Sequence, residues 1–332
     1  MANSRPRGYV ALCVCGLLLL MALTVAVTIG SRPLDLIRAF HGASPDREIL
    51  LQLRLPRAIL AMWTGGALAL SGVLFQALLR NSLATPYTLG VSGGASLGAV
   101  IAIVFGWNSA HGVSGVTLAA FAGSAIVLLL NVVLASNRGR MSSISLLLAG
   151  VTINSMCGAA VLFISNLVGV LKSFSVTRWL MGGIDAPDYE TLFWLTMILT
   201  PTAVVVFWHS REWNLLSVGE TWAATRGVST RRLLIIGCIA GSILTGAVTA
   251  LTGPIAFVGL IVPHALRMWA GADHRILAPC SFLLGAAFVA LCDAVSRTVL
   301  APVEIPVGVI ASLLGGPFFV WMLSSRQRGI SL

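Results

Sequence analysis

The chain has 332 residues, of which 57% are hydrophobic and 10% are charged. Soluble domains carry about 25% charged residues, so this composition excludes an ordinary soluble protein and predicts an integral membrane protein. The formal net charge is +10. A basic balance of this size is typical of nucleic-acid binding or of membrane topology, and the positions of the cations along the chain decide between the two.

Ten apolar stretches, most of them close to the roughly 20 residues that a spanning helix needs, are separated by short polar segments. We expect spanning helices at residues 9–30, 57–79, 87–106, 116–136, 142–167, 189–208, 231–251, 255–268, 276–296 and 306–324. The first stretch follows Arg5 and Arg7, but its 22 residues are too many for the apolar region of a typical signal peptide, so we interpret it as a retained helix. The sequence therefore predicts an all-α fold in which residues 1–332 form a single polytopic domain.

The cations divide unequally between the two sides that ten spans define. With the amino terminus inside, 13 of the 21 cations and 3 of the 11 acids fall inside, an excess of 13 − 3 = 10. The outside set holds 21 − 13 = 8 cations and 11 − 3 = 8 acids, so its net charge is zero. Short cytoplasmic loops of membrane proteins carry such an excess of Arg and Lys. Both termini are therefore predicted to be cytoplasmic, and the basicity gives no reason to invoke nucleic acid.

Small residues mark the second predicted span, 57–79, and polar residues mark its two ends. Arg54 and Arg57 stand at its outer end, Gly65 and Gly66 lie within it, and a polar turn at Asn81 follows it. Glycines and other small residues at helical spacing let neighbouring helix backbones approach closely. We therefore expect tight helix packing around this span.

Between residues 251 and 275 an apolar run is interrupted by glycine and proline. Proline removes a backbone donor and glycine loosens the helix, so the freed carbonyls need protein or water partners inside the membrane. The predicted eighth span is therefore short and broken, which favours a transport pathway over a plain lipid anchor. The residues of this predicted helix break are Gly253, Pro254, Gly259, Pro263 and His264.

The sequence contains no recognisable metal or catalytic motif. His264 has no partner at a metal-ligating spacing, so we expect it to make a structural hydrogen bond, and the six cysteines lie in apolar stretches without paired spacing. A phosphate-binding Gly-x-x-x-x-Gly-Lys-Ser/Thr loop is absent, and the only lysine is Lys172. If ATP drives this protein, a partner must hydrolyse it.

Two segments on the inner side are candidates for protein contacts or a pathway. The longest inner segment, 210–232, mixes small, polar and aromatic residues. It suits a short helix lying against another protein, with a solvated loop as the alternative. Ser142 and Ser143 open the fifth predicted span, and they either face a pathway or cap the helix.

Several blocks of the chain, in this order, resemble the permease subunits of ABC importers for iron-siderophores, haem and vitamin B12. The blocks are residues 54–57, 80–95, 219–227, 251–275, 293–297, 304–310 and 314–318. The resemblance implies the fold of a type II importer permease. It also implies a homodimer around a central pathway, two ATP-binding cassette subunits, and a periplasmic or lipid-anchored substrate-binding protein. ATP and Mg would then be bound by the partner ATPase and not by this chain.

The resemblance also implies roles for individual residues. Coupling to the ATPase is implied for Gly219, Glu220, Ala223, Ala224, Arg226 and Gly227. Docking of the binding protein is implied for Arg54, Arg57 and Arg297, although these arginines would alternatively anchor in lipid headgroups. A cytoplasmic gate is implied at Asn81, Leu83, Ser142 and Ser143. Two positions depart from the family pattern, because Ser82 replaces a proline and Arg226 replaces a leucine.

The sequence thus predicts the permease subunit of an importer in the bacterial inner membrane, with a ferric siderophore as the favoured cargo and cobalamin or haem as alternatives. An ion- or proton-coupled secondary transporter is the rival interpretation. Such a transporter ordinarily needs ionisable residues within the membrane, for which Asp293 and Glu304 are the candidates. A membrane-embedded enzyme is disfavoured because no nucleophile, base or metal set can be assembled.

Overall fold

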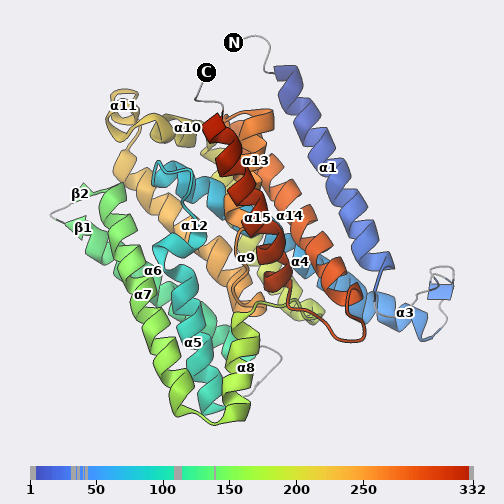
Figure 1. Cartoon of the computed structure of the whole chain (residues 1–332). Coiled ribbons are helices and arrows are strands. Elements are labelled where there is room, and N and C mark those ends of the chain that lie inside the picture. The colour runs from blue at the N-terminus through green and yellow to red at the C-terminus, as the bar shows by residue number, and fades with distance from the viewer. Residues whose placement is uncertain are drawn as a thin grey trace.

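The computed structural model describes residues 5–30, 35, 38–39, 41, 44–107, 114–137 and 140–328, and it is built almost entirely of helices (Figure 1). One helix coincides with each of the ten predicted spans. These are α1 (Arg5–Thr28), α4 (Leu55–Leu78), α5 (Val91–Phe105), α6 (Gly115–Ala135), α7 (Ser143–Leu167), α9 (Tyr189–Trp208), α12 (Thr230–Thr252), α13 (Val258–Ala270), α14 (His274–Thr298) and α15 (Val307–Arg328). The predicted all-α class is confirmed.

Shorter elements connect these helices. They are α3 (Asp46–Glu48), the π-helical segment η1 (Ile49–Arg54), the 3-10 helix η2 (Pro86–Leu89), α8 (Val170–Leu180), α10 (Ser210–Val218) and α11 (Glu220–Thr225). Two strands of two residues each, β1 (Ser136–Asn137) and β2 (Arg140–Met141), pair antiparallel between α6 and α7. Helix α8 is not among the predicted elements, because its 11 residues are too few to span a membrane.

Seven helices of the described part are long and apolar enough to cross a membrane. The other three of the ten are shorter: α5, α13 and the apolar part of α15, Val307–Trp321. Helix α5 begins at Val91 rather than at residue 87, because Gly90 adopts a φ of 74° and separates it from η2. A left-handed residue of this kind interrupts a right-handed helix, and glycine adopts it without steric cost.

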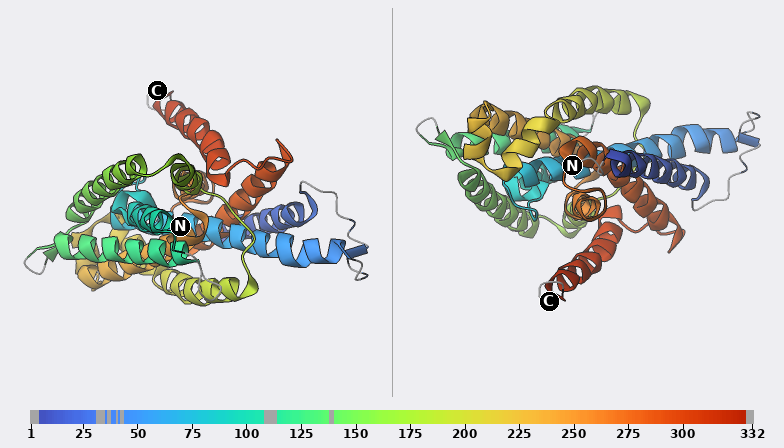
Figure 2. Two further views of the ribbon diagram at one scale, coloured as in Figure 1. Left: turned by 90° about the horizontal axis from the view of Figure 1, so that it is seen from below. Right: turned by 90° about the horizontal axis from the view of Figure 1, so that it is seen from above.

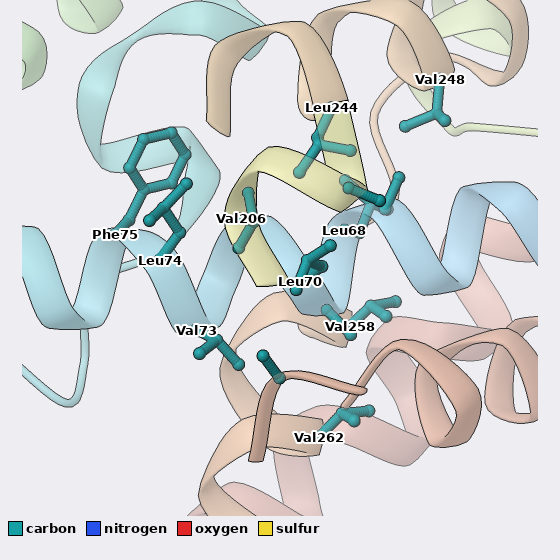
Figure 3. Packing of buried hydrophobic residues seen from close by; sticks show 14 of the residues in the cluster. Leu68, Leu70, Val73, Leu74, Phe75, Val206, Leu244, Val248, Val258 and Val262 are labelled. Atoms are coloured by element: carbon teal, nitrogen blue, oxygen red, sulfur yellow. The ribbon is translucent and has the colours of Figure 1, made fainter. Parts of the chain in front are cut away.

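The buried core is organised around α4, which packs against α14, α12, α13 and α9. Figure 3 shows Leu68 and Leu70 of α4 among side chains of the neighbouring helices, including Val206 of α9 and Leu244 of α12. A Cβ atom added at Gly72 would lie only 2.0 Å from the carbonyl oxygen of Gly259 in α13. The predicted tight packing around the second span is therefore confirmed.

The long helices give the molecule two distinct ends and two flanks. The beginning of α1 and the end of α15 lie at the same end as α10 and α11, which we call the α11 end, whereas α3 lies at the opposite end, the α3 end (Figure 1). Both views in Figure 2 place α9 on one flank and α7 and α15 on the other. The beginning of α1 and the end of α15 therefore lie on the same side of the molecule, the arrangement expected for an even number of spans.

Candidate functional site

The predicted helix break lies between α12 and α13. Helix α12 ends at Thr252, Gly253 has a φ of 67°, and the chain stays non-helical through Pro254 until α13 begins at Val258. The carbonyl of Thr252 accepts a hydrogen bond from the backbone N–H of Gly183, at 2.8 Å. The freed carbonyl therefore has a protein partner, as a non-helical segment at membrane depth requires.

The other residues of the predicted break, Gly259, Pro263 and His264, lie inside the continuous helix α13, so this part of the prediction is wrong. The backbone donor that Pro263 lacks would have served the carbonyl of Gly259, four residues earlier. That carbonyl instead accepts a hydrogen bond from Nε2 of Gln76 in α4, at 3.1 Å. The Oε1 atom of Gln76 accepts in turn from Arg267, and His264 is buried in the same helix. One amide thus satisfies two groups of α13 and ties this helix to α4.

Replacement of Gln76 by leucine is expected to leave the Gly259 carbonyl and the Arg267 guanidinium without this partner. A buried polar group left unsatisfied costs about 1–3 kcal/mol, so the purified protein should unfold at a lower temperature. Ser71→Ala is the control, because Ser71 is also buried in α4 but donates only to Leu68 of its own helix, at 2.9 Å. Equal losses of thermal stability in the two variants would contradict the bridging role of Gln76.

At the α11 end, Glu220 connects three elements. It opens α11, and its Oε1 atom accepts from Nη2 of Arg80, beyond the end of α4, at 3.1 Å. The same oxygen lies 2.8 Å from Oγ of Ser143, the first residue of α7. Ser143 is also placed to donate to the carbonyl of Leu78 in α4, at 2.7 Å. A hydroxyl has one proton, so the two acceptors compete for it, and α11 is linked to the adjoining ends of α4 and α7.

The other predicted gate residues form two compact turns near this junction. Asn81 Oδ1 accepts from the backbone N–H of Leu83 at 2.9 Å, which shapes the turn after α4 without the proline of the family pattern. Leu83 itself is 48% exposed. Ser142 is the N-cap of α7, because its Oγ accepts from the backbone N–H of Ser145 at 3.1 Å. Ser142 therefore caps α7, and its role in a gate stays a prediction.

Helix α11 has a buried side and an exposed side. Ala223 is fully buried, whereas Ala224 is exposed and Trp222 is 40% exposed. The guanidinium of Arg226 lies 4.8 Å from the centre of the Trp222 ring, a cation–π contact that a leucine at this position would lack. Trp222, Ala224 and Arg226 therefore form an exposed surface beside the Glu220 junction, which we call the α11 face.

At the α3 end, Asp293 of α14 is completely buried between two arginines. Its Oδ1 atom lies 2.9 Å from Nε of Arg57, and its Oδ2 atom lies 3.1 Å from Nε of Arg297. Nη2 of Arg57 also pairs with Oε2 of Glu304, at 2.9 Å. Two guanidiniums and two carboxylates thus form a charge-balanced network that joins α4, α14 and the segment before α15.

The predicted docking arginines lie at the expected end of the molecule, but two of them are not on its surface. Arg54 and Arg297 are 6% and 5% exposed. Arg54 Nη1 donates to the carbonyls of Val27 and Thr28 at 2.9 and 2.5 Å, and Arg297 Nη2 donates to that of Ala26 at 2.9 Å. These carbonyls belong to the last turn of α1, where a cation is favourable. Burial also excludes lipid anchoring for Arg54 and Arg297.

A cavity of about 500 Å³ opens beside this network. Arg57, Glu304, Arg178 and Asp185 contribute its charged lining, and Thr252 at the end of α12 lines it too. The charges of the α3 end and the break between α12 and α13 therefore border one cavity.

Several residues of these sites were not singled out from the sequence. Arg80, Arg178 and Asp185 stand in short polar segments that give no local hint of their partners. Gln76 and Arg267 did carry a signal, since an amide and a cation within apolar stretches usually mark a buried hydrogen-bond network.

Comparison with known proteins agrees with this architecture. A model of the FecCD transport family matches residues 14–325. The ABC transporter permease protein YvrB of Bacillus subtilis is 40% identical over 85% of this chain and 80% of its own length. The hemin transport system permease protein HmuU of Yersinia pestis is 39% identical over 85% of this chain and 84% of its own length. The vitamin B12 import system permease protein BtuC of Salmonella newport is 37% identical over 83% of this chain and 84% of its own length.

A solved structure gives the same result for the fold. A metal-chelate type ABC transporter in an inward-facing conformation superposes with a TM-score of 0.83 and 30% sequence identity, over 96% of this chain and 99% of the solved one. The family model covers most of the sequence, including the helix break, the Glu220 junction and the Asp293 network. The chain therefore belongs to the FecCD transport family.

Proposed function

We propose that this chain is the permease subunit of an ATP-driven importer that takes up a metal chelate. The observation that carries the proposal is the Glu220 junction, because it links an exposed helix pair to the ends of two long helices at one side of the protein. Two relatives, a hemin permease and a vitamin B12 permease, support cargo of this class. The metal-chelate type of the structural neighbour supports it as well.

In this proposal the α11 face docks on a separate ATPase subunit, which binds ATP and Mg. Movement of that subunit displaces residues 219–227. Because Glu220 holds Arg80 and Ser143, the displacement reaches the ends of α4 and α7 directly. Those ends carry Asn81, Leu83 and Ser142, the proposed cytoplasmic gate. The motion that ATP drives would thus be transmitted to the gate by short polar contacts rather than by deformation of long helices.

The assembly we propose contains two copies of this chain, two ATPase subunits, the surrounding membrane lipid and one substrate-binding protein. The flank formed by α7 and α15 suits the contact between the copies (Figure 2). It exposes large apolar side chains, including Leu148 and Phe163 of α7 and Leu313 and Trp321 of α15, each at least 60% exposed. Nucleic acid has no part in this assembly.

The α11 end is proposed to face the cytoplasm of a bacterial cell and the α3 end to face outward, because the cationic excess lies at the α11 end. Single cysteines at Arg47, exposed in α3, and at Ser217, exposed in α10, test this in a background without the native cysteines. An impermeant maleimide should label position 47 and spare position 217 in intact cells. Both should react after permeabilisation, and the reverse pattern in intact cells would overturn the orientation.

Docking of the binding protein is proposed for the α3 end, where Arg57 is the accessible member of the three arginines, with 13% of its side chain exposed. An acidic residue of the partner would replace Glu304 as its ion-pair partner, while Arg54 and Arg297 hold the surface in place. Arg57→Gln should then weaken pull-down of the binding protein by about tenfold or more at low salt. Glu304→Gln should preserve or strengthen it. Unchanged binding by Arg57→Gln, with normal ATPase assembly, would contradict the proposal.

Transport by the reconstituted complex tests the function itself. Proteoliposomes containing this chain, its ATPase and its binding protein should accumulate one metal chelate only when ATP and the binding protein are both supplied. Ferric siderophores, cobalamin and haem are the chelates to compare, and the siderophore is our first choice. Uptake driven by a proton or sodium gradient without ATP would instead support a secondary transporter. That rival has no specific contact in its favour, because its candidate carboxylates Asp293 and Glu304 both pair with Arg57.

A further inference from the structure

We propose that a basic pocket at the α11 end binds the headgroup of an anionic phospholipid. The pocket has a volume of about 300 Å³ and lies where the end of α9, the beginning of α10 and the first turns of α14 meet. Its lining residues are Phe207, Trp208, Ser210, Arg211, Arg275 and Pro279. It is separate from the α11 face, the helix break and the cavity of the α3 end.

Two positive charges in this pocket lack a counter-charge from the protein. Arg211 and Arg275 are both exposed, and neither forms an ion pair with a carboxylate in the part of the chain that the structure describes. Two carboxylates lie close by in the sequence, but neither forms an ion pair with these guanidiniums. Glu212 lies 3.1 Å from Nδ1 of His209, and Asp273 accepts from the side chain of Asn214 and from the backbone N–H of Arg275. Guanidinium groups bind the oxygens of a phosphate diester through charge-assisted hydrogen bonds, and two of them line this pocket.

The surroundings favour a lipid over a free phosphate ion. Trp208 is 83% exposed at the end of α9, and tryptophan concentrates at the boundary between lipid and water. Along α9, Met197 and Val204 are each 53% exposed and offer an apolar track for acyl chains. Helix α9 lies on the flank opposite α7 and α15 (Figure 2), so the proposed dimer contact leaves it to the membrane. Basic pockets between spanning helices bind anionic headgroups in this way.

Lipid binding at this position would act on the segment that leads to α11. Arg211 belongs to α10, and only Gly219 separates α10 from α11. A headgroup held by Arg211 and Arg275 would therefore brace α10 against α14. This inference requires only that the chain spans a membrane, and it survives whatever cargo is transported.

The test measures lipid binding to the purified full-length chain by native mass spectrometry. The probes are phosphatidylglycerol and phosphatidylcholine with identical acyl chains. Wild type should retain phosphatidylglycerol in preference to phosphatidylcholine. The double variant Arg211→Gln with Arg275→Gln should lose this preference, with affinity for phosphatidylglycerol lowered about tenfold or more, since each charge-assisted hydrogen bond is worth that factor. Arg231→Gln with Arg232→Gln is the matched control, because both arginines are exposed at the beginning of α12.

The control pair should bind phosphatidylglycerol as wild type does. Equal retention by the pocket variant and the control would overturn the proposal, as would equal binding of the two lipids by wild type. Competition by inorganic phosphate at millimolar concentration distinguishes a site for a lipid headgroup from a site for free phosphate. Displacement of the lipid by phosphate alone would show a general anion site and reject the lipid assignment. If the double variant cannot be purified, Arg211→Gln alone should show an intermediate loss, and an unchanged preference would count against the site.

Discussion

Replacement of Ala224 by glutamate is expected to abolish ATP-dependent uptake while leaving the permease folded. Ala224 is exposed on α11 beside Trp222 and Arg226, so the larger side chain points away from the core. If this face docks on the ATPase, the substitution buries an unpaired charge at the contact. Such a charge costs several kcal/mol, and about 3 kcal/mol already lowers association roughly 100-fold. Co-purification of the ATPase and uptake by proteoliposomes measure the effect.

Two variants separate docking from folding. Ala224→Ser keeps the side chain small and neutral, and it should assemble and transport normally. Ala223→Glu instead places a carboxylate at a fully buried position, so it should lower the thermal stability of the permease itself. Normal ATPase co-purification and transport by Ala224→Glu would show that the α11 face is not the docking surface.

Replacement of Asp293 by alanine is expected to cause the largest loss of stability of any single substitution at the α3 end. The carboxylate is completely buried and pairs with both Arg57 and Arg297; without it Arg297 loses its ion-pair partner and Arg57 keeps only Glu304. Removing one partner of a buried ion pair costs about 3–5 kcal/mol. Thermal unfolding of the purified permease should show a correspondingly lower midpoint.

Glu304→Gln is the matched control for Asp293→Ala. Glu304 also pairs with Arg57, but 41% of its side chain is exposed, and exposed ion pairs contribute about 0–1 kcal/mol. The double variant Asp293→Ala with Arg297→Ala should lose less stability than the sum of its two single variants, because Asp293 and Arg297 interact directly. Equal midpoints for Asp293→Ala and Glu304→Gln would show that the network does not stabilise this end.

The helices and their order could be read from the sequence because their causes are local. A membrane span needs a continuous apolar segment whatever its neighbours are, so the ten segments can be predicted from the sequence alone. The break after Thr252 was visible for the same reason, since Gly253 and Pro254 act on their own backbone. The family blocks added an ordered set of residues, and their implied roles in coupling, gating and docking stay predictions.

The sequence pattern mispredicted or missed local structure in several places, most clearly where a side chain distant in the sequence supplies a hydrogen bond. Pro263 was expected to break its helix, but Gln76 supplies the donor that proline lacks, from 183 residues away in the chain. The π-helical turn before α4 and the separate helix α8 also left no clear mark in the residue pattern.

Composition, hydrophobic periodicity and the distribution of arginines by themselves determined that this is a membrane protein with ten helical segments and an asymmetric charge. Only the tertiary structure decided how individual charges are used. Arg57 meets Asp293 across 236 residues, Ser143 meets Glu220 across 77, and Arg54 reaches back to the end of α1. The physical reason is range: the apolar character of a segment and its helical hydrogen bonds are set within a few residues, whereas a contact between distant side chains depends on which helices pack side by side.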